Sequence, residues 1–315
     1  MTIISLSSLE FFHHDLTDNR STSGIFLFNQ PEHLFLQSEK GWRVYGLQHK
    51  PSNRIAAQIF LNIKGKKVFS PLRAPFGSLE LYENVGQRKV EELFAWIEAD
   101  LKGRNIKFCQ IKHYPETYQT VVTNSLHQAL TKLNFDCTEE VSSIIPVDQK
   151  SFDKRIAISQ RQKLRKSEKR FAFSQSKLAE LKKVYGFINA CRYERNQSLS
   201  LTLARLQKVV NKFPKNFILF QVADEQQIAA AAIVIKVSDK ILYTFYYAHD
   251  RRFNRISPTV FLISGIYKYA QEHHFTHIDL GTSMVNGGIN RPLIQFKKSI
   301  GGQPSYKYIF EKTFS

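Results

Sequence analysis

The sequence predicts an α/β protein built from two copies of one strand-and-helix unit in tandem. The first observation is a repeat, because the apolar segment Ile55–Leu61 resembles Ile228–Val234 further along the chain. The second is the order of the elements after each segment: another strand, an amphipathic helix and a third strand at matching spacing. This repeated order indicates duplication of one α/β unit, with a central mixed sheet flanked by helices in each half.

The first copy can be followed element by element. The strand that opens at Ile55 continues through Ile63, turns at a Lys-Gly pair and returns through Lys67–Pro71. Residues 87–102 carry apolar side chains at the spacing of one helix face, which predicts a helix there. An apolar strand is expected over Ile106–Ile111. The first half therefore contains the complete strand, strand, helix, strand order.

The second copy repeats that order and adds helices before it. A Ser-Asp turn leads into a strand over Ile241–Tyr247, a helix over Pro258–Glu272 and a strand over Phe275–Leu280. We expect further elements in this half, among them a helix with apolar spacing over Lys177–Asn196 and a polar, basic helix over Lys154–Arg170. The others are a helix over Leu201–Phe213 and strands over Asn216–Val222 and Tyr306–Phe310.

Length and composition fit two domains with a large core. The chain has 315 residues, of which 43% are hydrophobic and 25 are Phe, and a domain takes roughly 150 residues. This excludes a disordered chain and a small disulfide scaffold. The repeat predicts an N-terminal domain over residues 1–150 and a C-terminal domain over residues 151–315, and no low-complexity linker separates them.

The sequence gives no sign of export or of a membrane span. The longest apolar run, Ile228–Ile235, is short of the roughly 20 residues that cross a bilayer. Met1–Leu16 lacks the basic start of a signal peptide. Cys109, Cys137 and Cys191 are scattered, which is typical of buried, reduced thiols. We therefore expect a cytoplasmic protein, and we expect it to be a monomer.

Positive charge is concentrated in the second half. Residues 1–150 hold 17 Lys or Arg and 16 Asp or Glu, whereas residues 151–315 hold 28 and 11. This asymmetry predicts an anionic partner there: tRNA, a nucleotide-linked or lipid-linked precursor, or peripheral contact with a membrane surface. Lys150–Arg170 alone has nine basic residues against two acidic ones. For that segment, a solvated lysine-rich face is the alternative interpretation.

Several catalytic patterns are absent from the sequence. It has neither of the Gly-rich loops that bind dinucleotides or triphosphates, and no GxSxG nucleophile motif. It lacks the Cys spacing of zinc sites, and His273, His274 and His277 straddle a predicted helix end and the next strand. We therefore predict no metal site, and the sequence gives no support for a covalent Ser or Cys nucleophile.

The start of the helix at Pro258 is a candidate phosphate site. Ser257 suits an N-cap and Pro258 suits the first helical position. Arg251, Arg252 and Arg255 precede them. Backbone N–H groups at a helix start attract anions, so this arrangement favours a phosphate. A plain capped helix with surface arginines is the alternative.

A glycine-rich basic segment is the second candidate. Gly281–Gly302 starts where the strand carrying Asp279 ends, and ligands of open α/β sheets bind at that edge. Gly287 and Gly288 allow the backbone to approach a ligand closely. The segment also supplies positive charge, from Arg291, Lys297 and Lys298. The alternative is a glycine loop followed by a solvated basic helix.

Several short motifs of this half carry a family resemblance. They are Ile278-Asp279-Leu280-Gly281, Gly288, Phe296-Lys297-Lys298, Gly301-Gly302, Tyr246-Tyr247-Ala248 and Ser257-Pro258. Together they resemble the C-terminal signature of the Fem-type (FemAB-like) peptidoglycan-bridge aminoacyltransferases, and also acetyltransferase-like proteins of the GNAT superfamily. The resemblance covers the second half and reaches the first through the repeat. It implies two tandem GNAT-like domains and transfer of an aminoacyl group from tRNA to a cell-wall precursor, without the coiled-coil hairpin of some Fem enzymes.

The resemblance, with the chemistry of acyl transfer, implies three catalytic residues. Transfer to an amine needs a free-base nucleophile, a donor for the developing oxyanion and charge to balance phosphates. Lys297 matches the family's Phe-Lys lysine, which implies contact with substrate phosphate or with the reacting ester. We expect the Lys297 side chain to contribute little buried area to the core. Tyr247 would line the substrate channel and donate a hydrogen bond. Asp279 could orient the amine or accept its proton, or simply shape a turn.

Binding roles are implied for a second set of residues. Arg195 is similar to the family's helix-borne arginine for phosphate, with Arg192 as its competitor. Further substrate or phosphate contacts are expected from the two candidate anion sites, through Arg255, Ser257, Gly288, Arg291 and Lys298.

Three functions stay open at this point. The first is a Fem-like acyl- or aminoacyltransferase acting on an amine of an anionic acceptor, the second a CoA-dependent N-acyltransferase, and the third a non-catalytic anion-binding module. The donor would be aminoacyl-tRNA or acyl-CoA, and no resident cofactor is indicated. CoA-dependent GNAT enzymes hold the pyrophosphate in a Gln/Arg-x-x-Gly-x-Gly/Ala loop. Here Arg252–Ser257 has Arg255 and Ser257 at the two small-residue positions, which predicts weak CoA binding.

Overall fold

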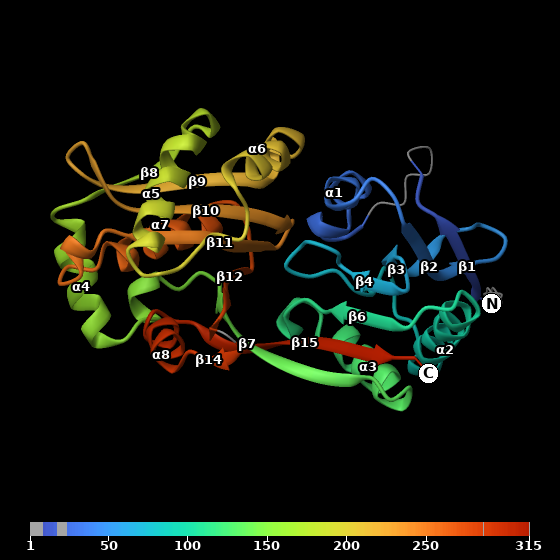
Figure 1. The fold of residues 1–315 in the computed structure, drawn as a ribbon. Coiled ribbons are helices and arrows are strands. Elements are labelled where there is room, and N and C mark those ends of the chain that lie inside the picture. Colours follow the sequence, from blue (N-terminus) through green and yellow to red (C-terminus); the bar gives the residue numbers. More distant parts are fainter. Residues whose placement is uncertain (1–8, 18–23, 286, 315) are drawn as a thin grey trace. The chain divides into compact units, whose positions relative to one another are not determined.

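The computed structural model describes residues 9–17, 24–285 and 287–314 (Figure 1). The chain forms two compact units, which we describe separately. Unit 1 comprises Met1–Glu140 with Tyr306–Ser315, and unit 2 comprises Val141–Ser305. The division therefore lies before the predicted boundary at residues 150 and 151, and the last ten residues join the first unit.

Unit 1 is a mixed sheet with helices on both faces. Its strand order is β1-β2-β3-β4-β6-β15, with β5 paired to β3. Val44 packs against Leu34 of α1, whereas the hydroxyl of the next residue, Tyr45, donates to Asp100 of α2. Because neighbouring strand residues point to opposite faces, α1 and α2 cover opposite sides. The elements are β1 (Leu9–Asp15), α1 (Pro31–Gln37), β2 (Trp42–His49), β3 (Ile55–Lys64), β4 (Lys67–Ser70), β5 (Glu80–Leu81), α2 (Gln87–Gly103), β6 (Phe108–Lys112), α3 (Thr120–Lys132) and β15 (Gln303–Thr313).

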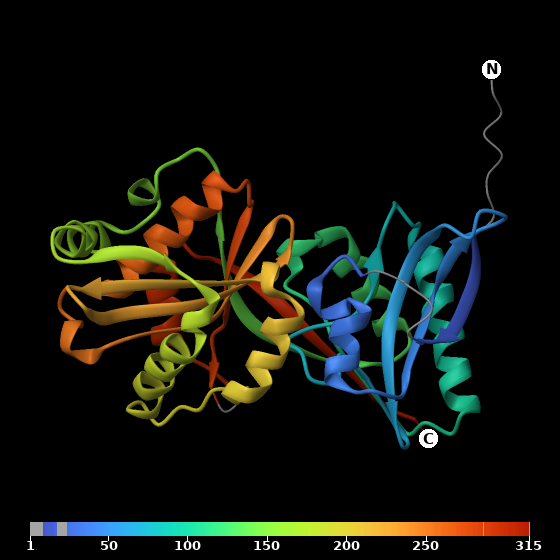
Figure 2. The same cartoon turned by 90° about the horizontal axis from the view of Figure 1, so that it is seen from above.

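Unit 2 has the same architecture. Its strand order is β7-β12-β11-β10-β9-β8, and α7 and α5 pack on opposite faces of this sheet (Figure 2). A separate two-stranded ribbon, β13-β14, follows β12. The elements are β7 (Asp136–Pro146), α4 (Ile158–Glu168), β8 (Ala172–Ser176), α5 (Leu181–Tyr193), α6 (Leu203–Lys212), β9 (Phe217–Asp224), β10 (Gln227–Ser238), β11 (Ile241–His249), α7 (Pro258–Glu272), β12 (His277–Thr282), β13 (Met284–Val285), β14 (Gly288–Ile289) and α8 (Arg291–Ser299).

The structure confirms the duplicated order of elements. In unit 1, β3 and β4 pair antiparallel and β6 joins β4 in parallel after α2. In unit 2, β10 and β11 pair antiparallel and β12 joins β11 in parallel after α7. The strand beyond differs from a simple tandem repeat. β15 pairs antiparallel with β6 in unit 1, and β7 pairs antiparallel with β12 in unit 2. Unit 1 thus takes the strand beside β6 from the C-terminal end of the sequence, whereas the β7 residues that pair with β12 belong to unit 2 itself.

Two neighbouring strands of unit 2 separate part-way along their length. β11 and β12 are paired only as far as Tyr243 and Asp279. The β10–β11 register shifts just after Tyr243, so that β11 gains an extra residue there, and such a bulge bends its strand. Beyond that point β11 is no longer paired with β12. The hydroxyl of Thr244 bridges the start of the split by donating to the Asp279 carbonyl oxygen, at 2.9 Å.

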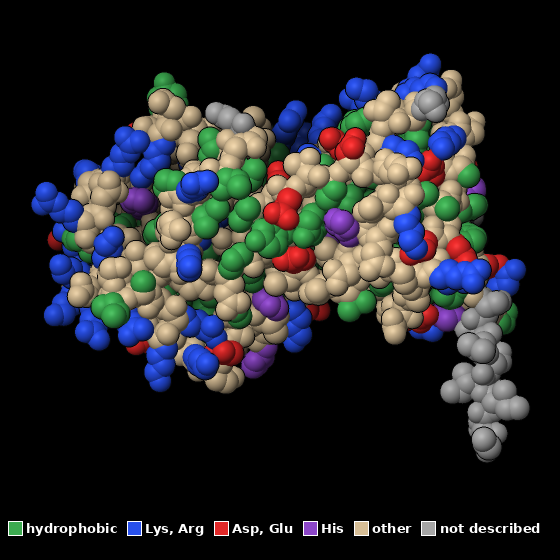
Figure 3. Space-filling view, turned by 90° about the horizontal axis from the view of Figure 1, so that it is seen from below, with side chains coloured by type: hydrophobic (Ala, Val, Ile, Leu, Met, Phe, Trp, Pro, Cys, Tyr) green, Lys and Arg blue, Asp and Glu red, His purple; other side chains and the backbone are tan. Residues whose placement is uncertain are grey.

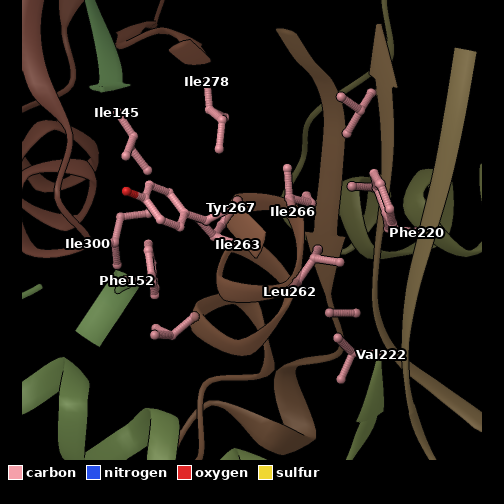
Figure 4. Close-up of a cluster of buried hydrophobic side chains, with 14 of the residues drawn as sticks. Ile145, Phe152, Phe220, Val222, Leu262, Ile263, Ile266, Tyr267, Ile278 and Ile300 are labelled. Carbon is pink, nitrogen blue, oxygen red and sulfur yellow. The ribbon is translucent and has the colours of Figure 1, made fainter. Parts of the chain in front are cut away.

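The core of unit 2 lies between its sheet and α7. Figure 4 shows Leu262, Ile263 and Ile266 of α7 among buried side chains of the strands, and Ile300 joins the same cluster. Gly265 lets the helix approach the sheet, because a Cβ atom there would lie 2.3 Å from the Phe173 ring. Burying one such aliphatic side chain stabilises the fold by about 1.5–3 kcal/mol, so this cluster fixes α7 firmly against β10 and β11.

The three cysteines are free, but they are not all buried. Cys109 and Cys191 are buried as predicted, and burial raises the pKa of the Cys109 thiol to about 12. Cys137 is exposed on β7, so the expectation of burial was wrong for it. It lies in the first part of the strand, where the other side chains are exposed too.

No helix in the part of the chain that the structure describes is long and apolar enough to cross a membrane.

Candidate functional site

Lys297 on α8 is a buried cation at the split between β11 and β12. Its side chain is 1% exposed, and its Nζ donates to the carbonyl oxygens of Gly281 at 2.7 Å and Thr282 at 3.0 Å. Burial lowers the pKa of this ammonium to about 8; Asp279 opposes the shift and Arg192 adds to it. The expectation that the Lys297 side chain contributes little buried area to the core was therefore wrong.

Two local features hold Lys297 in this position. The Asn290 side chain caps α8 by accepting from the Leu293 N–H at 3.1 Å. At the other end, the Gly302 N–H donates to the Lys297 carbonyl oxygen at 2.8 Å. A Cβ atom at residue 302 would lie 2.7 Å from that oxygen, so the close approach requires glycine. The Gly301-Gly302 pair thus closes the helix directly behind the lysine.

Asp279 shapes the turn to which Lys297 is bound. The carboxylate is 2% exposed, and its Oδ1 accepts from the Gly281 N–H at 2.7 Å and from the Ser142 hydroxyl at 3.2 Å. Gly281 has a φ of +74°, which favours glycine. These bonds orient the Gly281 carbonyl, which accepts from Lys297. The turn-forming role left open for Asp279 is therefore present in the structure.

Arg192 on α5 is hydrogen-bonded to Tyr247 on β11. The Tyr247 side chain is half-buried against the core of unit 2, and burial raises its pKa to about 12. Arg192, near the end of α5, donates to the Tyr247 carbonyl oxygen at 3.2 Å and to Gln197 at 2.7 Å. Its charge lowers the pKa of both Tyr247 and Lys297. Arg192, which the sequence motifs indicated only as the competitor of Arg195, is thus electrostatically coupled to both predicted catalytic residues.

Arg195 lies in the turn just after α5 and has a different set of partners. Its guanidinium donates to the Cys191 carbonyl oxygen at 2.6 Å and to the His249 carbonyl oxygen at 3.1 Å. The His249 ring also contacts Asn254 at 2.8 Å and Thr259 at 2.8 Å, and burial lowers its pKa. These hydrogen bonds connect the end of α5 with the start of α7. Arg195 therefore stabilises the structure at this position.

The start of α7 differs in part from the predicted anion site. Pro258 is the first helical residue, as predicted, but the Ser257 side chain makes no capping hydrogen bond and its φ is +60°. Arg252 is paired with Asp250, at 2.6 and 2.9 Å, which lowers its availability for a ligand. Arg255 is exposed, without a hydrogen bond or ion pair among the described residues. The site thus retains Arg251 and Arg255 as exposed cations.

Gly288, Arg291 and Lys298 do not gather around Lys297. Gly288 is exposed in the β13–β14 ribbon, and Arg291 and Lys298 lie on the exposed side of α8. In Figure 3, Lys and Arg side chains are plentiful over unit 2 and Asp and Glu are sparse. Within the described ranges, no three His, Cys, Asp or Glu side chains are placed as metal ligands.

Comparison with known proteins identifies the fold of this chain. Residues 158–298 match the family model of the acetyltransferase (GNAT) domain. The crystal structure of FemX is similar over 96% of this chain and 97% of its own, with 14% identity and a TM-score of 0.67. A tandem GNAT protein from the clavulanic acid biosynthesis pathway is similar over 97% and 98%, with 8% identity and a TM-score of 0.52. L-PGS from Bacillus licheniformis is similar over 92% and 87%, with 12% identity and a TM-score of 0.52. No curated protein matches the sequence.

The fold and the family match define the class of protein. Unit 2 carries an acetyltransferase-type domain, and the protein is an acyltransferase. Its overall fold is that of the tandem GNAT proteins and of FemX.

Proposed function

We propose that the protein transfers an aminoacyl group from tRNA to an amine of an anionic acceptor, at the split between β11 and β12. The observation that carries the proposal is the buried Lys297 ammonium, which is bound to two carbonyl oxygens and is within the electrostatic influence of Asp279 and Arg192. The likeness to FemX over 96% of the chain supports an aminoacyl donor. A cell-wall precursor is the acceptor we favour, in the cytoplasm, with the protein acting as a monomer.

The reaction can be written without a separate catalytic base. The acceptor nitrogen attacks the ester carbon, a C–N bond forms and the C–O bond to the tRNA ribose breaks. The proton released by the nitrogen ends on the departing ribose oxygen. In this proposal a charged Lys297 stabilises the negative charge that develops on the ester oxygens, and the Tyr247 hydroxyl donates a hydrogen bond to it. Arg192 supplies further positive charge for a phosphate of the acceptor.

CoA-dependent N-acylation is the second candidate. The acetyltransferase family match favours it, and so does the left-handed Ser257, which stands at a position where CoA-binding loops use a small residue. The exposed Arg255 in the same loop could bind a phosphate through its guanidinium.

The test is transfer of a labelled acyl group by Lys297→Met, which keeps the volume of the buried side chain. Both Met and Ala leave the Gly281 and Thr282 carbonyls without their donor, but Ala would also leave a void, which destabilises the core further. We expect Lys297→Met to lose at least 100-fold in kcat/KM with an unchanged circular dichroism spectrum. Lys268→Met, at an exposed position on α7, is the control.

Assays run in parallel with aminoacyl-tRNA and with acetyl-CoA decide between the two donors. Wild-type activity retained in Lys297→Met would refute the site. Turnover with acetyl-CoA alone would favour the second candidate.

A further inference from the structure

The β13–β14 ribbon stands out from unit 2 as an apolar element. It forms its own two-stranded sheet, in which Met284 pairs with Ile289 and Val285 with Gly288. Val285 and Ile289 therefore point to opposite faces of the ribbon. Both are large and exposed, at 47% and 56%. Since both faces carry an exposed aliphatic side chain, the ribbon does not lie flat on the body of the unit.

The stretch of chain that contains this ribbon carries positive charge only. No Asp or Glu occurs between Leu280 and Phe310, whereas Arg291 and Lys298 are exposed on α8. These two residues, with Gln295 between them, are spaced to share one face of the helix. Arg291 follows Ile289 by two positions, so the first cation lies directly beside the apolar tip.

We propose that the β13–β14 ribbon and the exposed face of α8 bind the surface of an anionic lipid bilayer. Val285 and Ile289 would enter the boundary between headgroups and acyl chains, while Arg291 and Lys298 remain at the level of the lipid phosphates. Apolar tips flanked by cations bind membranes in this way. A protein partner fits less well, since stable protein interfaces use roughly 20–30 residues on each side.

This contact would bring the candidate site to the membrane. The ribbon follows Thr282, whose carbonyl accepts from Lys297, and it leads directly into α8, which carries that lysine. An acceptor amine on a lipid-linked molecule would then be presented close to the site. The identity of that acceptor rests on the proposed function, but binding to the bilayer does not.

The experiment is co-sedimentation of the whole protein with vesicles, without any donor or acceptor. We expect binding to phosphatidylcholine vesicles containing about one-third phosphatidylglycerol, and at least tenfold weaker binding to phosphatidylcholine alone. The double variant Val285→Ser/Ile289→Ser should lower binding at least tenfold. Arg291→Gln/Lys298→Gln should do the same at low salt. Val121→Ser, at an exposed position of unit 1, is the matched control and should bind like the wild type.

A second measurement places the ribbon in the bilayer. Val285→Trp should shift its fluorescence to the blue when anionic vesicles are added. The proposal is overturned if the wild type does not bind, or if the Ser double variant binds as tightly as the wild type. It is also overturned if sedimentation shows that the apolar pair joins two copies of the chain. None of these results depends on catalysis, so a failure here leaves the acyltransferase proposal to its own test.

Discussion

Lys297 is the residue whose chemistry depends most on its surroundings. A lysine on a short basic helix would ordinarily be solvated, and its sequence neighbour Lys298 is exposed. Lys297 is buried because the turn built by Asp279 and Gly281 offers it two carbonyl oxygens. Buried ammonium groups are costly unless they are hydrogen-bonded, so these two bonds make the position possible.

We predict opposite effects of pH on activity and on stability at this residue. Transfer should decline above about pH 8 as Lys297 loses its proton. An unfolded lysine keeps its proton up to about pH 10.5, so between these values the unfolded chain binds more protons than the folded one. The contribution of Lys297 to the free energy of unfolding therefore rises with pH across that window.

Urea unfolding and transfer rates between pH 7 and 10 test this, with Lys297→Met as the reference. The difference between the two proteins isolates the lysine. A free energy of unfolding that falls with pH in the wild type relative to the variant would contradict the assignment.

At the scale of elements, the repeated core could be predicted from the sequence. The helix over Pro258–Glu272 has the predicted bounds, because its apolar spacing and its initial proline are local signals. β7 and β8 were not predicted. Three of the five residues of β8 are exposed, as is the first part of β7, so neither has a clear apolar pattern. α1 and α3 also escaped prediction. The Asp250–Arg252 pair was overlooked too, although only one residue separates the two.

The candidate site could be predicted only in part, because it depends on contacts distant in sequence. Asp279 accepts from Ser142 on β7, a contact that no local pattern indicates. The choice between Arg192 and Arg195 likewise depends on which guanidinium approaches Tyr247 and which approaches His249.

The loop between β11 and α7 carries a prediction about coenzyme A. Arg252 is bound to Asp250, and the loop has no glycine whose backbone could close on a pyrophosphate. We therefore predict that acetyl-CoA binds with a dissociation constant of about 1 mM or weaker. Calorimetric titration of the purified protein measures this directly. Saturable binding in the low micromolar range would instead favour the CoA-dependent candidate.

At the scale of the whole molecule, charge distinguishes the two units. Counted over Val141–Ser305, unit 2 holds 27 Lys or Arg and 11 Asp or Glu, which leaves 18 and 16 for unit 1. We predict that tRNA binds through unit 2 with a steep dependence on salt. Each phosphate contact contributes about −0.7 on single strands, or about −0.9 on duplexes, to the slope of log affinity against log salt.

Fluorescence anisotropy between 50 and 200 mM salt would give this slope. We expect the replacement of the exposed Lys166 and Lys169, at the end of α4, with Gln to make this slope shallower. The change should be at most the contribution of about two phosphate contacts. A flat response in the wild type would remove the argument for a nucleic-acid partner.

The placement of the C-terminal strand β15 in the sheet of unit 1 also bears on the synthesis and the evolution of the molecule. The sheet of unit 1 lacks the strand beside β6 until residues 306–313 are present, and Phe310 on that strand is fully buried. During synthesis the N-terminal unit must therefore wait, with an open sheet edge, for almost the entire remainder of the chain. For the same reason unit 1 could not be transferred to another protein as one continuous segment, whereas unit 2, Val141–Ser305, is continuous in sequence.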